Sequence, residues 1–170
     1  MANITITPGA EARHYRESRN VELSTLKFIE DSLAIDWSDI NIVKSWTQLE
    51  KVKNPVICVI LDDTEYARAE LGNTNYRKTY VFNIDLFAKS DAQRLDLSDW
   101  LMDILNPGWV YYEISQSSGN NRSLVYTDTG RCRLESVIVN TKIDLGKMGD
   151  VKDKYRQSIV VSVTIGCNHD

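Results

Sequence analysis

The chain has 170 residues, 42% hydrophobic and 26% charged, which is typical of a single globular domain that folds without a disulfide or a structural metal. No apolar run is long enough to span a membrane, and the N-terminal segment lacks a secretory signal, so we expect a cytosolic protein. The net charge of −4 disfavours a free-standing nucleic-acid-binding protein, because phosphate binding needs a basic surface.

The N-terminal part predicts a flexible leader over residues 1–19, followed by one domain over residues 20–170. Asn20 is a suitable N-cap, and the helix that it begins is expected to end near Ile35 or Asp36. The apolar residues of this segment recur at roughly helical spacing: Val21, Leu26, Ile29 and Leu33.

The next third predicts strands. Residues Ile40–Trp46 form a short strand candidate, and the continuous apolar run Pro55–Leu61 predicts a strand buried on both faces. Residues Lys78–Phe87 alternate clearly between apolar and polar. Together they predict a first long hairpin over Pro55–Phe87, turning near Gly72-Asn73. One face of its second strand is apolar: Tyr80, Phe82, Ile84 and Leu86.

A second helix is predicted over Asp91–Leu105, because Ser90 and Gln93 have the spacing of a capping box. Residues Trp109–Ile114 predict another strand. The polar segment Ser115–Gly130 predicts a loop or a mobile finger, in which Ser123–Tyr126 is a candidate for a short strand. A second long hairpin is expected over Arg131–Cys167, with its turn near residues 146–150.

This order predicts an α+β fold: a mixed, mostly antiparallel β-sheet with two α-helices packed on one face and long protruding β-hairpins. An arm of about 15 residues spans roughly 50 Å, whereas a compact chain of this size has a radius of gyration of about 15 Å. Part of each arm should therefore bend around the core or leave it. Such extensions need a partner surface, which favours assembly over catalysis.

Residues able to perform chemistry are few. Asp62 and Asp63 follow a buried strand, where carboxylates can bind a metal ion, but no histidine and no second acidic cluster accompany them in the pattern. His14 and His169 lie near the termini, and no glycine-rich phosphate loop is present. We therefore expect no enzyme, no catalytic residue, no metal and no cofactor. A metal-dependent nuclease-like enzyme using Asp62 and Asp63 stays as the alternative.

The order of elements resembles that of the tail terminator, or tail completion, proteins of long-tailed bacteriophages. The resemblance is architectural and covers most of the chain. It rests on a helix, a buried strand ahead of a long polar hairpin, a strand that leads into a second helix, and closing strands. The matching segments are Val21–Ile35, Pro55–Leu61, Lys78–Phe87 and Ser90–Leu105, with the strands that follow.

The resemblance implies a structural virion protein that is made in the host bacterial cytoplasm and resides in the neck between head and tail. Such proteins form a ring, expected to be a hexamer, at the head-proximal end of the tail tube. The ring ends tube polymerisation and provides the surface for head attachment. Its partners would be copies of itself, the tail tube protein and the head-tail connector protein, with DNA only in transit through the lumen and no membrane. Another phage neck or tail component is a further alternative.

Two groups of residues follow as candidate contacts. The first hairpin is rich in Tyr and Arg, which are enriched in protein interfaces, so it is expected to contact a neighbouring subunit. Its candidate residues are Glu65, Tyr66, Arg68, Glu70, Asn73, Tyr76 and Arg77. The segment Ser115–Gly130 is expected to contact the tube, the connector or the lumen. Its candidate residues are Ser117, Asn120, Asn121, Arg122 and Asp128.

Overall fold

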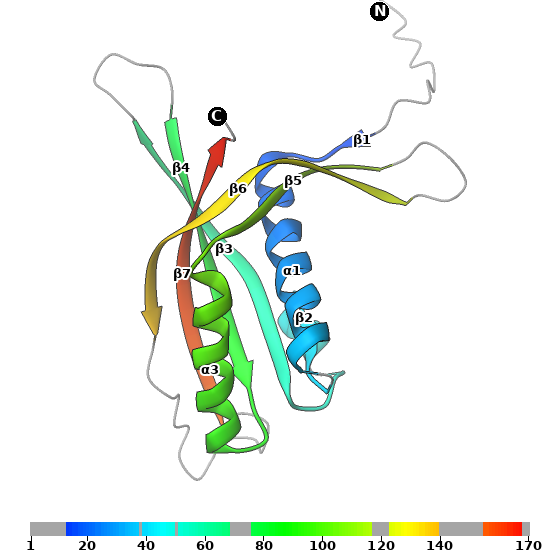
Figure 1. The fold of residues 1–170 in the computed structure, drawn as a ribbon, viewed down its shortest axis with the longest axis vertical. Helices are drawn as coiled ribbons and strands as arrows, with labels where there is room; N and C mark the ends of the chain where they lie inside the picture. Colours follow the sequence, from blue (N-terminus) through cyan, green and yellow to red (C-terminus); the bar gives the residue numbers. More distant parts are fainter. Residues whose placement is uncertain are drawn as a thin grey trace, which may run out of the picture.

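A computed structural model of the chain describes residues 13–37, 39–49, 51–68, 76–116, 123–139 and 155–167. In this part of the chain, strands form one mixed sheet in the order β1-β5-β6-β7-β4-β3-β2, in which only β2 and β3 pair in parallel (Figure 1). The predicted α+β class, with a mostly antiparallel sheet, is confirmed. The helices are α1 (Glu17–Asp36), α2 (Trp46–Leu49) and α3 (Asp91–Leu105). The strands are β1 (Arg13–His14), β2 (Asn41–Val43), β3 (Val56–Arg68), β4 (Tyr76–Phe87), β5 (Trp109–Gln116), β6 (Leu124–Val139) and β7 (Arg156–Cys167).

The main core lies between one face of the sheet and the two long helices. Alternate residues of β3, β4 and β7 face this core, as the period of two in a strand requires. Helix α1 contributes Val21 and Ile29, and α3 contributes Leu97 and Leu101. The predicted apolar face of β4 is confirmed, since its four residues are fully buried. Each such side chain stabilises the fold by about 1.5–3 kcal/mol.

A smaller cluster covers the opposite face at the parallel end of the sheet. Leu49 of α2 packs there with Val56, Cys58 and Phe87. The prediction that Pro55–Leu61 is covered on both faces is confirmed for Val56–Val59, which are fully buried, whereas Ile60 and Leu61 are half-buried. The strand predicted over Ile40–Trp46 was too long, because Trp46 begins α2.

Helix α1 begins four residues earlier than predicted. Asn20 lies inside the helix and is buried, so its prediction as the N-cap was wrong; Arg16 occupies the cap position. Residues 13–19, predicted to belong to a flexible leader, include β1 and the first turn of α1, while residues 1–12 lie outside the described part. Asn20 was misread because a buried asparagine can find its hydrogen bonds in tertiary contacts instead of at a helix end.

Helix α3 follows its prediction closely. The Gln93 N–H donates to Ser90 Oγ over 3.2 Å, and the Lys89 N–H donates to Gln93 Oε1 over 2.8 Å. A polar network ties the helix to β7: the Arg94 guanidinium donates to Gln157 Oε1, and Gln157 Nε2 donates to Ser98 Oγ over 3.1 Å. These bonds fix α3 over the middle of the sheet.

The two long ladders have the predicted partners. β3 pairs with β4 from Val56↔Phe87 to Arg68↔Tyr76, and β6 pairs with β7 from Gly130↔Cys167 to Val139↔Ile159. The predicted turns near Gly72-Asn73 and near residues 146–150 lie outside the described residues.

The segment Ser115–Gly130 differs from its prediction as a loop. β5 continues to Gln116 and β6 starts at Leu124, and these two residues pair. The candidate short strand at Ser123–Tyr126 corresponds to the start of β6, a strand of 16 residues. The polar residues that follow Tyr126 have no strand pattern, so its continuation was not predicted.

Candidate assembly surfaces

The predicted subunit-interface residues lie on the distal part of the β3–β4 ladder. Glu65 and Tyr66 are exposed, and Tyr66 retains 62% of its accessible surface. Arg77 is exposed and forms an ion pair of 2.6 Å with Glu135 of β6. The backbones of Arg68 and Tyr76 form the last described pair of the ladder. Their side chains, and all of Glu70 and Asn73, lie outside the described part.

Of the residues predicted to contact tube, connector or lumen, only Asp128 can be placed. It lies on β6, where it is exposed and pairs with Tyr112 of β5. Ser117, Asn120, Asn121 and Arg122 lie outside the described residues. Of this group, the structure therefore describes the position of Asp128 alone.

Asp62 and Asp63 occupy a β-bulge in β3, where the register shifts between Leu61 and Asp63. Both side chains are exposed, and the Asp63 carboxylate accepts the Thr64 N–H over 2.7 Å. Among the described residues, no group of three or more His, Cys, Asp or Glu side chains is arranged to hold a metal ion. In the same part of the chain, no helix has both the length and the apolar character needed to cross a bilayer.

One edge of the sheet is closed by helix α1. The Tyr112 N–H donates to Ser24 Oγ over 3.0 Å, and the Ile114 N–H donates to Asn20 Oδ1 over 3.3 Å. Tyr15 then donates its N–H to the Ile114 carbonyl, and β1 pairs with the rest of β5. Polar helix side chains thus satisfy backbone groups that another strand would otherwise pair with.

Other strand edges have no partner strand within the described residues. β4 and β7 pair only as far as Tyr80↔Val163, so Tyr76–Thr79 and Thr164–Cys167 form the two sides of a fork. β6 pairs with β7 only from Gly130 onward, which leaves the edge of Leu124–Thr129 open. β3 continues past β2 from Val59 to Arg68. Figure 1 shows the β3–β4 and β5–β6 ladders leaving the sheet in different directions.

A groove of about 650 Å³ lies in the fork. Glu17, in the first turn of α1, lines this groove and accepts hydrogen bonds from Tyr80 and, over 3.0 Å, from Lys78. Burial raises the pKa of Tyr80, and the bond to Glu17 raises it further. Burial likewise raises the pKa of Tyr111, which accepts a hydrogen bond from Asn20 over 3.5 Å. Both phenols therefore stay neutral at ordinary pH.

A polar bridge crosses the fork near this groove. Glu135, at the bulge of β6, accepts hydrogen bonds from Thr164 of β7 and Arg77 of β4, both at 2.6 Å. The hydrogen bond from Thr164 lowers the pKa of Glu135 most, and the bond from Arg77 lowers it further. Acidic and basic side chains balance in the lining of the groove: Glu17, Glu113 and Glu135 against Arg77, Lys78 and Arg133. The mixed charge suits a polar protein segment better than a phosphate group.

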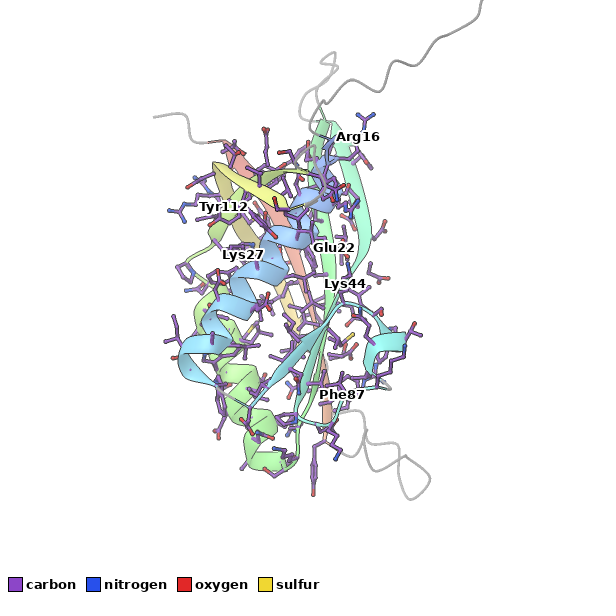
Figure 2. All side chains as sticks on the ribbon, turned by 90° about the vertical axis from the view of Figure 1, so that its right-hand side faces the viewer. Arg16, Glu22, Lys27, Lys44, Phe87 and Tyr112 are labelled. Carbon is purple, nitrogen blue, oxygen red and sulfur yellow. The ribbon has the colours of Figure 1, made fainter. Side chains whose placement is uncertain are left out.

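Sequence patterns missed an exposed apolar stretch at the start of β6. Leu124, Val125 and Tyr126 keep 38%, 47% and 38% of their surface exposed. The Tyr126 ring meets Tyr112 edge-on with 5.7 Å between centroids, and the Lys27 ammonium lies 5.7 Å from the Tyr126 ring. Lys27 and Tyr112 are labelled in Figure 2, where α1 runs in front of the sheet. An apolar strand with an open edge favours pairing with another chain.

Comparison with known proteins found no relative of this chain. No protein-family model matches the chain, and no curated protein is similar to it.

Proposed function

We propose that this chain is a non-enzymatic structural protein of a phage neck. It forms a ring at the head-proximal end of the tail tube, ends tube polymerisation and provides the surface for head attachment. The proposal includes contacts with copies of itself, with the tail tube protein and with the connector protein, and it places the protein in the virion.

One observation carries the proposal: closed and open edges coexist in a single sheet. Asn20 and Ser24 seal β5, while β3, β4, β6 and β7 each keep an edge without a partner strand in the described part of the chain. Open edges in a monomer are a hazard for aggregation unless a specific partner covers them. Strand pairing between chains supplies such a cover, and a ring repeats it around an axis.

The decisive experiment adds the purified protein to tail tube protein from the same phage or prophage during polymerisation. We expect tubes to stop growing at shorter lengths as the protein is added, with ring-shaped density at one end in electron micrographs. A matched variant replaces Tyr66, exposed on the β3–β4 ladder, by Ala, with Leu95→Ala on the exposed surface of α3 as the control. Tube lengths that do not respond to the native protein, with no density at either end, would contradict the proposal.

The nuclease alternative needs a separate measurement. Mg²⁺ or Mn²⁺ is titrated into the protein with DNA present, and the same titration is done with Asp62→Ala. We expect neither metal binding nor DNA cleavage that depends on Asp62. Cleavage lost in the variant would replace the structural proposal by an enzymatic one.

A further inference from the structure

The sheet face that points away from α1 and α3 carries opposite charges at its two sides. On β3, Asp63 and Glu65 pair with Val81 and Thr79, which alternate with the core residues Tyr80 and Phe82 and so point to the far face. On β6, Arg131 and Arg133 flank the buried Cys132 and point to the same far face. All four charged side chains are exposed. Asp63 and Glu65 are named here the acidic margin, and Arg131 and Arg133 the basic margin.

None of the four forms an ion pair with another described residue, but Arg133 lies close enough to Glu135 to help lower the pKa of that carboxyl group. Asp63 accepts only the neighbouring Thr64 N–H. Between the margins, by contrast, the pair Arg77–Glu135 neutralises the centre of the face. β4 and β7 separate β3 from β6, so the margins are about three strand spacings, or about 14 Å, apart where the strands pair, and the fork lies between their outer parts. Within one copy, the acidic margin and the basic margin are therefore too far apart to form ion pairs with each other.

The basic margin is held in place by the neighbouring strand. Arg133 lies across Gly166 of β7, where a Cβ atom would come within 3.1 Å of its Nε. The acidic margin stands beside the open edge of β3, which extends from Val59 to Arg68 past the end of β2. Each margin thus has a defined position, on β3 or on β6, and both project from the same face of the sheet.

We propose that the acidic margin of one copy binds the basic margin of a second copy, head to tail. The occupant is a second copy because the chain itself presents both complementary charges, and neither margin forms an ion pair with other described residues. Contact between two different patches is heterologous and repeats around a ring. Opposite surface charges provide specificity and a faster encounter more than raw affinity. The inference rests on the proposed function for its ring and adds which surfaces meet.

Charge reversal tests this contact. One variant carries Asp63→Arg with Glu65→Arg, and a second carries Arg131→Glu with Arg133→Glu. Each alone should weaken self-association at low salt by about tenfold or more, measured by sedimentation, because attraction becomes repulsion at every contact. An equimolar mixture should restore association, since every contact between unlike variants again joins opposite charges. Native association should also weaken as salt increases.

Matched controls reverse the same number of exposed charges elsewhere. Asp96→Arg with Asp99→Arg lies on α3, and Lys51→Glu with Lys53→Glu lies before β3. Both should associate like the native protein, and circular dichroism should show that all variants are folded.

Three results would overturn the contact: a native protein that stays monomeric at high concentration and low salt, reversed variants that associate normally, or a mixture of folded variants that fails to associate. The tube experiment is independent of these. A protein that stops tube growth without charge-dependent self-association overturns the contact alone. Charge-dependent assembly without any effect on tubes overturns the proposed function alone.

Discussion

Asn20 shows how one side chain can join a helix to a sheet. It donates to the Tyr15 carbonyl over 3.4 Å and to Tyr111 over 3.5 Å, and it accepts the Ile114 N–H over 3.3 Å. Its amide supplies both donors and an acceptor, which a hydroxyl or carboxylate at this position could not do. Sequence alone could not predict this role, because its partners lie as far as 94 residues along the chain.

Replacing Asn20 by Ala should destabilise the protein by about 1–3 kcal/mol, because the buried Ile114 N–H loses its acceptor. The free energy of unfolding is measured by urea denaturation. Glu30→Ala on the exposed face of α1 is the control and should change it by less than about 0.5 kcal/mol. Equal stability of Asn20→Ala and the native protein would show that the sealing of β5 does not depend on this amide.

Tyr80 should limit the stability of the folded protein at alkaline pH. Its pKa is raised above the ordinary value of 10.0 by burial and by Glu17, so its contribution to stability is complete below pH 10 and is lost as pH rises above it. Tyr80→Phe should cost about 0.5–1.5 kcal/mol at neutral pH and reduce the loss of stability above about pH 10. Thermal unfolding across this range measures both effects. Tyr126→Phe, at an exposed ring, should leave the alkaline profile unchanged.

At the scale of elements, the turn between α3 and β5 depends on a glycine. Gly108 has a φ of +76°, and a Cβ there would lie 2.6 Å from the Cys132 carbonyl oxygen. The clash is with backbone of β6, which cannot move away without disturbing its ladder. The end of α3 at Leu105 was predicted correctly, but the local pattern could not reveal this approach by a distant strand.

Gly108→Ala should therefore lower the free energy of unfolding by about 1–3 kcal/mol. Gly166→Ala is the matched comparison, since a Cβ there would meet only the flexible Arg133 side chain, at 3.1 Å. We expect the second change to cost clearly less in the same denaturation experiment. A smaller cost for Gly108→Ala than for Gly166→Ala would contradict this account.

Sequence predicted the elements best where local pattern and tertiary role agree. Helix α3 has its own cap at Ser90, and β4 alternates cleanly, so both were predicted closely. Prediction was wrong where distant contacts decide the outcome. Residues 127–130, predicted as a loop, continue β6 because they pair with β5. Asp85 lies on the face of β4 opposite the apolar one, as the alternation predicts, but the pattern could not reveal that it is buried there in an ion pair with Arg156. The open edges depend on strand order, which no local pattern contains.

At the scale of the whole molecule, the core should protect two of the three thiols. Cys58 and Cys132 are fully buried, and burial raises their pKa to about 11 and about 12. In a Cys167→Ser variant, both should react with a thiol reagent only as fast as the fold opens, because the thiolate is the reactive form. Mild denaturant should accelerate labelling. Rapid labelling of either thiol in the native state would contradict a tightly packed centre.

The position of β7 has a consequence for biosynthesis. It is the middle strand of the described sheet, yet it is translated after all the others. Until it emerges from the ribosome, β4 and β6 are both without their shared neighbour, and the two halves of the molecule have no common backbone ladder. The nascent chain is therefore most exposed to misassembly just before synthesis of this region is complete. Premature termination ahead of Arg156 would leave β4 and β6 without the strand that joins their ladders, so the two groups of strands would be connected through helix α1 and not through a continuous sheet.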